Sequence, residues 1–282
     1  MGHLCDRMNA DLVLAGRSES TRKHYIGCAK RFVKFFMRSP EQLGENEVRH
    51  FLLHLRQRNL SVGYYLQFLG ALQFLFAVTL QRPDVTHNIP WPKMRAPRRD
   101  VMTTDEVARL LHAARTPFWR VFLTTAYAAG LRRMEVAAIR APDIDRAAGL
   151  LRVPHGKGDK ARDVMLDPEL YLQLREHWRT QQLPGPWLFP ARAGNRWADH
   201  PVGLGLASAA FRDAADTAKL TRHMTLRSLR AAFATHLLED GIDVFTLQQL
   251  LGHERLETTS QYARVRTDRI RATPSPLSKL PK

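Results

Sequence analysis

The sequence predicts a mainly α-helical protein that carries one small β-sheet and is divided into two domains. Its 282 residues exceed the usual size of a single domain. Apolar residues recur at three- and four-residue steps along most of the chain, whereas only residues 150–166 have the pattern of two paired strands. A proline-rich stretch separates the two parts. We therefore expect domains at residues 1–88 and 102–265, a linker at 89–101 and a tail at 266–282.

The N-terminal domain is expected to be helical from Ser18 to Leu80. Apolar residues between Tyr25 and Phe36 follow the helical period, and a second stripe begins at Val48. The opposite face of the first helix is basic. An isolated charge run is usually a solvated face, but the net charge of the chain favours a surface that faces DNA. The residues predicted to bind DNA here are Lys23, Lys30, Arg31 and Lys34.

The overall charge points to a polyanionic partner. The chain has 43 Lys and Arg against 27 Asp and Glu, a formal charge of +16, so nucleic acid is the first candidate. The most apolar stretch, from Tyr64 to Leu80, is interrupted by Gln67, Gly70 and Gln73 and predicts a buried helix, not a membrane anchor. With two cysteines and no secretory pattern at the start, we expect a reduced, cytoplasmic protein with no membrane partner.

The predicted linker contains three prolines, which exclude regular structure. Its four cations could follow a phosphate backbone, although a basic solvated linker is the alternative. These further candidates for DNA binding are Lys93, Arg95, Arg98 and Arg99.

The second domain begins with a capping pattern, in which the hydroxyl of Thr103 caps a helix and Glu106 reaches back. Two short strands, 150–153 and 162–166, flank a glycine-rich turn. The remaining elements are expected to be helices at 117–129, 132–140, 168–180, 201–218, 225–239, 243–251 and 256–264.

Two basic residues of this domain lie next to or two positions after a glycine. Arg132 follows Gly130, which can end one helix so that the next begins with its donors aimed at an anion. Arg133 is a rival for this role, and a surface pair with Glu135 is the alternative interpretation. Lys157 lies between two glycines, in a turn that leaves its ammonium free to reach a groove, with Lys160 as a possible substitute.

Three further candidates lie near the end of the second domain. Arg230 starts Arg-Ala-Ala-Phe-Ala-Thr-His, whose His236 is expected to be a packed or capping residue. His253 follows Gly252, which ends a helix, and Tyr262 comes nine positions later. Alone, each of these would usually be structural. As a set they could supply a nucleophile and donors for a phosphate.

Together these motifs resemble the phage-integrase family of tyrosine recombinases. The matching segments are Gly-Leu-Arg-x-x-Glu, Gly-Lys-Gly, Arg-x-x-Phe-Ala-Thr-His, and Leu-Leu-Gly-His with a tyrosine nine residues on. The resemblance implies an N-terminal helical core-binding domain and a mixed α/β catalytic domain. It also implies that Arg132 and Arg230 hold the scissile phosphate, that Lys157 protonates the leaving group, that His253 supports them and that Tyr262 is the nucleophile.

The same resemblance implies the partners and the reaction. A member of the family is a site-specific recombinase or integrase that breaks and rejoins double-stranded DNA through a 3′-phosphotyrosyl intermediate. Four protomers usually assemble on two recombination sites, and such enzymes are often encoded by mobile elements involved in transposition. No cofactor and no metal are required, and His253-Glu254-Arg255-Leu256-Glu257 lacks the second histidine of a zinc-protease motif.

Two positions of the family's His-x-Leu-Arg-His segment differ in this chain, where Arg227 stands for the first histidine and Ala231 for the last. Where the family usually has histidine, this chain has Arg227, which can donate hydrogen bonds to phosphate but cannot accept a proton in the protein range. His223, just before the helix capped by Thr225, is a possible replacement. The departure leaves open a second interpretation, a catalytically impaired accessory or regulatory DNA-binding protein. RNA binding fits less well because no RNA-binding module is recognisable.

Overall fold

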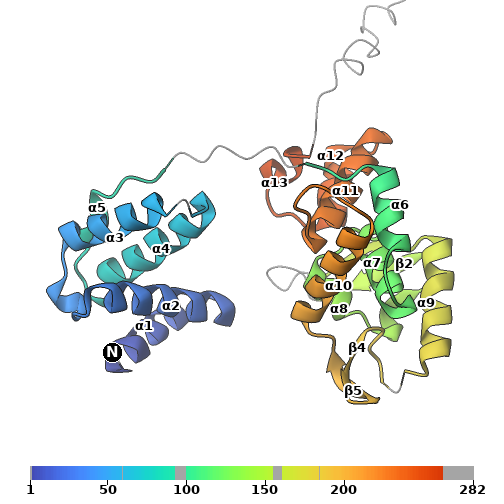
Figure 1. Cartoon of the computed structure of the whole chain (residues 1–282), viewed down its shortest axis with the longest axis horizontal. Coiled ribbons are helices and arrows are strands. Elements are labelled where there is room, and N and C mark those ends of the chain that lie inside the picture. The colour runs from blue at the N-terminus through green and yellow to red at the C-terminus, as the bar shows by residue number, and fades with distance from the viewer. Residues whose placement is uncertain (1, 59, 93–99, 155–160, 184, 263–282) are drawn as a thin grey trace, which may run out of the picture. The chain divides into compact units, whose positions relative to one another are not determined.

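The computed structural model describes residues 2–58, 60–92, 100–154, 161–183 and 185–262. The chain divides into two compact units, Met1–Arg98 and Arg99–Lys282, which are treated separately below (Figure 1). Most of the described residues are helical, and the strands belong to the second unit. The predicted tail, 266–282, and residues 93–99 of the predicted linker lie outside the described residues.

The first unit is a helical domain, as expected. Its first helix was not predicted, because Met8 and Leu12 are the two residues that it buries and they make too short an apolar stripe. The next helix begins after Ser18, whose hydroxyl accepts a hydrogen bond from the Thr21 amide. The elements are α1 (Gly2–Leu14), α2 (Glu19–Phe36), a 3₁₀ turn (Pro40–Gln42), α3 (Glu45–Gln57), α4 (Val62–Phe74), a π-helical turn (Leu75–Thr79) and α5 (Asp84–His87).

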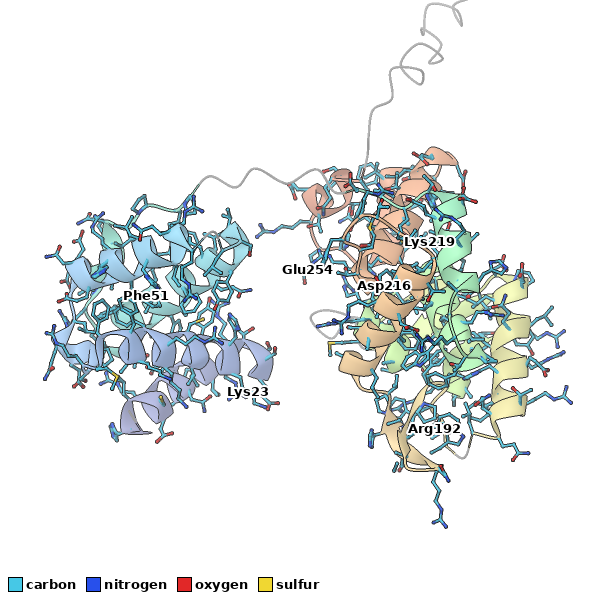
Figure 2. The ribbon with its side chains drawn as sticks, viewed as in Figure 1. Lys23, Phe51, Arg192, Asp216, Lys219 and Glu254 are labelled. Atoms are coloured by element: carbon cyan, nitrogen blue, oxygen red, sulfur yellow. The ribbon has the colours of Figure 1, made fainter. Side chains whose placement is uncertain are left out.

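The core of this unit is aromatic. Phe32 is fully buried and makes edge-to-face contacts with Phe36, Phe51 and Phe76. Figure 2 shows Phe51 between the helices and Lys23 at the surface. The helix Val62–Thr79 is long and apolar enough to cross a membrane by length and composition alone. In the structure this segment packs on α2 and provides core residues, as the sequence predicts.

The second unit has the helices expected from the sequence, with small differences at their ends. The predicted helix 132–140 is shorter than expected because residues 139–141 pair with another segment. The Ala141 amide donates to Pro186 O, and the Leu188 amide donates to Ile139 O. The helices are α6 (Thr104–His112), α7 (Pro117–Ala128), α8 (Arg133–Ala137), a 3₁₀ turn (Ala141–Asp143), α9 (Pro168–Gln181), α10 (Leu204–Thr217), α11 (Leu226–Glu239), α12 (Val244–Leu251) and α13 (Leu256–Ser260).

Two small antiparallel sheets complete the unit. The predicted strand pair is present as β2 (Leu150–Val153) and β3 (Arg162–Met165), with Leu151 opposite Val164, and β1 (Ile144–Asp145) adds an edge. A second sheet, of β4 (Pro190–Ala193) and β5 (Arg196–Pro201), was not predicted. Its Trp197 stacks on Phe118 of α7, so tertiary packing favours the hairpin. Because β5 ends at Pro201, α10 begins later than expected.

Candidate active site

Five of the six predicted catalytic residues line one pocket of the second unit. This pocket has a volume of about 910 Å³ and opens between α8, α10, α11 and the segment after α12. The sixth residue, Lys157, lies outside the described residues. The five that the structure brings together are Arg132, Arg227, Arg230, His253 and Tyr262.

A close contact between α7 and α11 positions Arg132. Gly130 follows the end of α7 with φ of 58°, and a Cβ atom at this position would lie 2.3 Å from the Phe233 ring of α11. Glycine therefore satisfies both the left-handed turn and the close packing. Two residues later Arg132 caps α8, and its amide donates to Glu135 Oε2 at 2.7 Å.

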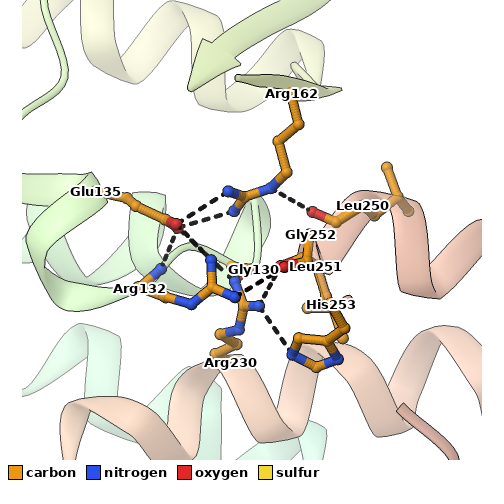
Figure 3. A network of polar contacts seen from close by, with 9 residues as sticks. All are labelled: Gly130, Arg132, Glu135, Arg162, Arg230, Leu250, Leu251, Gly252 and His253. Carbon is orange, nitrogen blue, oxygen red and sulfur yellow. Dashed lines mark hydrogen bonds and ion pairs between the residues drawn. The ribbon is translucent and has the colours of Figure 1, made fainter. Parts of the chain in front are cut away.

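Glu135 is the anionic centre of the site. Its carboxylate is buried and accepts two hydrogen bonds from Arg162, at 2.9 and 2.8 Å, and one from the Arg132 guanidinium at 2.7 Å (Figure 3). Arg230 Nη1 lies 3.8 Å away. Burial alone would raise the pKa of this carboxyl, but the hydrogen bonds and charges of Arg162 and Arg132 lower it to about 2. Glu135 therefore stays ionised and holds guanidinium groups together.

Arg230 is the most deeply buried of the arginines that line the pocket. Its side chain is 6% exposed, and Nη1 donates to Gly130 O at 2.8 Å. Nη2 contacts Leu251 O and His253 Nε2. Burial, followed by repulsion from Arg132, lowers the pKa of Arg230 to about 9. An anion that enters the pocket would relieve this repulsion.

Three successive carbonyls at the C-terminal end of α12 each accept a hydrogen bond from one arginine. Arg162 Nε donates to Leu250 O at 2.8 Å, Arg230 donates to Leu251 O, and Arg132 Nη2 donates to Gly252 O at 3.1 Å. Such carbonyls lack partners within the helix and carry the negative end of its dipole. The end of α12 and Glu135 thus fix all three guanidinium groups.

His253 follows directly after this turn. Its Nε2 lies 3.2 Å from Arg230 Nη2, and its Nδ1 lies 2.9 Å from Thr259 Oγ1 of α13. Burial is the largest cause that lowers the pKa of His253, and the neighbouring arginines, Arg230 first, add to it. The resulting pKa is about 4. The ring is therefore neutral near pH 7.

Tyr262 lies beside His253 at the end of the described chain. The two rings stack with centroids 6.3 Å apart and an interplanar angle of 19°. Tyr262 is 7% exposed and packs in a cluster with Phe233 of α11 and Leu251 of α12. The phenol is therefore positioned by the same two helices that hold Arg230 and the arginine-bound carbonyls.

Two residues that line the pocket concern the histidine that the family has and this chain lacks. Arg227 and His223 are both exposed, and both line the pocket. His236 does not line it. Tyr127 Oη and Met102 O lie 2.9 Å from its two ring nitrogens, so it is a packed histidine, as expected.

The predicted DNA-binding residues of the first unit have different surroundings. Lys30 and Lys34 line a shallow hollow between α1 and the end of α2. Lys23 pairs with Glu19 at 2.6 Å, and Arg31 donates to Tyr64 Oη at 2.5 Å. Four other candidates lie outside the described residues: Lys93, Arg95, Arg98 and Arg99.

Sequence reasoning missed three residues that organise the pocket. It treated Glu135 as a possible surface partner of Arg132, Arg162 as part of a strand, and Thr259 as part of a short helix. In the sequence, these three residues stand out only as polar residues within or near the segments that carry the motifs. No group of three His, Cys, Asp or Glu side chains in the described parts of the chain could hold a metal ion.

Comparison with known proteins identifies the family of both units. Residues 100–269 match the phage integrase family, and residues 4–84 match the N-terminal SAM-like domain of phage integrases. An integrase/recombinase of Sinorhizobium fredii is 38% identical over 100% of this chain and 91% of its own length. The tyrosine recombinase XerA of Pyrococcus horikoshii is 27% identical, covering 92% of this chain and 88% of its own.

Solved structures share the fold. A lambda integrase dimer bound to a COC′ core site has a TM-score of 0.76 at 21% identity, covering 95% of this chain and 96% of that one. The Tn1549 transposon integrase in complex with circular intermediate DNA has a TM-score of 0.75 at 15% identity, covering 95% and 98%. The predicted fold class, mainly helical with small sheets, is therefore confirmed.

Proposed function

The chain belongs to the phage integrase family of tyrosine recombinases, and on that basis we propose how it breaks and rejoins DNA. It is a site-specific recombinase whose partner is double-stranded DNA. Its proposed parts are a DNA-binding domain at 1–88, a linker at 89–101, a catalytic domain at 102–265 and a tail at 266–282. We propose that it acts in the cytoplasm, where four protomers assemble on two recombination sites.

The observation that carries the mechanism is the position of Tyr262 in one pocket with Arg132 and Arg230. A DNA phosphate in this pocket would receive hydrogen bonds from both guanidinium groups, which are already held by Glu135 and the end of α12. Donors that are fixed before the reaction stabilise the charge that develops on the phosphoryl oxygens without further reorganisation. The neutral His253 ring adds a further contact at the same place.

The proposed reaction transfers the phosphoryl group from one oxygen to another. Tyr262 gives its phenol proton to a base, for which His223 is the candidate in the pocket. Tyr262 Oη attacks phosphorus, a new O–P bond forms, and the bond from phosphorus to the 5′ oxygen breaks. Lys157 protonates the departing 5′ oxygen, which leaves a 3′-phosphotyrosyl bond and a free 5′-hydroxyl. The 5′-hydroxyl of a second duplex then gives its proton to Lys157 and attacks the phosphotyrosyl phosphorus, and Tyr262 leaves and regains its own proton.

The decisive experiment traps the covalent intermediate on a nicked duplex from which the short 5′-hydroxyl strand diffuses away. The wild-type protein should become attached to the DNA, and Tyr262→Phe should bind the duplex without forming an adduct. Tyr171→Phe is the matched control, because Tyr171 contacts Arg146 and does not line the pocket. An adduct that persists in Tyr262→Phe would overturn the assignment of the nucleophile.

A second candidate function follows from Arg227, which cannot take the phenol proton. Without a replacement base the protein would be an accessory DNA-binding protein of this fold. His223 lines the same pocket, and an imidazole is a side chain that can accept a proton. We expect His223→Ala to alter the pH profile of cleavage. An unchanged profile would make His223 a bystander, and tight binding with no adduct in the wild-type protein would favour the accessory function.

A further inference from the structure

Thr259 contacts His253 but does not itself line the pocket. Its side chain is fully buried, and Oγ1 lies 2.9 Å from His253 Nδ1. Thr259 belongs to α13, and its carbonyl accepts the amide of Tyr262 at 3.0 Å. One residue therefore contacts the ring of His253 through its side chain and the proposed nucleophile through its backbone.

In the free protein, the contacts of the two ring nitrogens select one tautomer of His253. The ring is neutral at the working pH, so it carries a single N–H. A guanidinium group has only donors, and Arg230 Nη2 lies 3.2 Å from Nε2, so Nε2 accepts. The proton is therefore on Nδ1, which donates to Thr259 Oγ1.

A bound phosphate would require the other tautomer. Phosphate oxygens accept hydrogen bonds, so His253 can contact them only through an N–H at Nε2, the nitrogen that faces Arg230 and the pocket. Nδ1 would then be a buried acceptor that needs a donor. The charged groups around the ring are the arginines Arg230, Arg132, Arg162 and Arg227, and Tyr262 stacks on it.

We propose that Thr259 is a positioning residue whose hydroxyl supports both tautomers of His253. In the free protein the hydroxyl accepts from Nδ1–H, and on DNA it rotates and donates to bare Nδ1 while Nε2–H contacts the phosphate. The exchange releases one proton from Nδ1 to water and takes one from water at Nε2, so the charge of the ring does not change. A hydroxyl is suited to this because it is both donor and acceptor. The inference rests on the proposed function, because it requires phosphate in the pocket.

The first test compares two substitutions at this position. Thr259→Val keeps the shape and removes the hydroxyl, whereas Thr259→Ser keeps the hydroxyl. We expect Thr259→Val to bind the duplex normally and to form the adduct about 10- to 100-fold more slowly, since a buried acceptor loses its partner. Thr259→Ser should restore most of the rate. Thr235→Val is the matched control, because Thr235 Oγ1 is buried without a hydrogen-bond partner among the described residues.

The second test reads the tautomer directly and needs no cleavage. In ¹⁵N NMR spectra, with His253→Gln used for assignment, the free wild-type protein should show its ring proton at Nδ1. Addition of the duplex to Tyr262→Phe should move that proton to Nε2. A ring protonated at Nε2 in the free protein, or a wild-type rate in Thr259→Val, would overturn the proposal. Failure of the proposed function is distinct, since it would leave the wild-type protein without an adduct whatever the tautomer.

Discussion

The arginines of the candidate active site and the basic residues of the first unit carry the same charge but differ in burial and in their bonding partners. Arg132, Arg162 and Arg230 are held by Glu135 and by the end of α12, through hydrogen bonds that use some of their donors. Lys30 and Lys34 line an open hollow on a surface helix. We propose that the first arrangement fixes donors in place for one phosphate and that the second supplies charge that attracts a polyanion from a distance.

The two arrangements also differ in what the loss of one member costs. Removing a partner from a buried ion cluster leaves an uncompensated charge. Exposed ion pairs contribute little and are weakened by salt. We therefore expect substitutions in the buried cluster of the second unit to lower stability strongly, and substitutions of the basic residues of the first unit to change mainly DNA affinity.

The largest effect is expected for Glu135→Ala. This change leaves Arg132, Arg162 and Arg230 facing one another, and unfolding should become easier by about 3–5 kcal/mol in denaturant titrations. The control is Asp213→Ala, which breaks an exposed pair with Arg115 in the same unit. It should cost at most about 1 kcal/mol. Equal losses in the two variants would remove the distinction between the buried cluster and the surface pair.

Arg162→Met tests whether the site depends on an arginine that does not line the pocket. Glu135 would lose two hydrogen bonds, and we expect a loss of roughly 3 kcal/mol in stability. Adduct formation should slow while duplex affinity changes little. Arg162→Lys should recover only part of the rate, because lysine cannot make the two-pronged contact. Loss of affinity in proportion to rate would instead indicate direct contact with DNA.

Acid should destabilise the second unit in two steps. The pKa of His253 is lowered from 6.5 to about 4, so the unfolded chain binds more protons in that interval and stability falls as pH decreases through it. The pKa of Glu135 is lowered from 4.5 to about 2, so its contribution is lost below pH 4.5. Burial also lowers the pKa of His177, in the same direction as His253. In melting curves from pH 7 to 4, His253→Gln should show a shallower decline, and an unchanged slope would contradict this.

The smallest effect on stability is expected in the first unit. The double variant Lys30→Ala, Lys34→Ala should leave the melting temperature nearly unchanged and weaken binding to all duplexes alike. If both lysines contact phosphates, the slope of log affinity against log salt should decrease by about 0.9 for each. Lys23→Ala is the comparison, because Lys23 already pairs with Glu19. A large loss of stability in the double variant would show that these lysines belong to the fold.

The sequence predicted most of the helices after Ser18 and the central strand pair because their apolar periodicity is local, whereas α1 buries too few residues to show it. It did not predict β4 and β5, since Pro190 and Ala191 are poor strand formers and the hairpin depends on Trp197 packing against α7. The site residues were predicted from motif spacing, and five of them line one pocket. The central role of Glu135 was not predicted. A three-residue spacing from Arg132 does not indicate that Glu135 is buried or that it binds a second arginine 27 residues away.

The eight residues of α12 have a consequence for how the chain tolerates length changes. Its last carbonyls bind arginines that lie 120, 88 and 21 residues away in sequence. One residue inserted between Val244 and Leu251 would turn the end of the helix by about 100° relative to its start. All three arginine contacts would be lost together. We therefore expect insertions and deletions to be excluded from this short helix, although none of its own residues takes part in the proposed reaction.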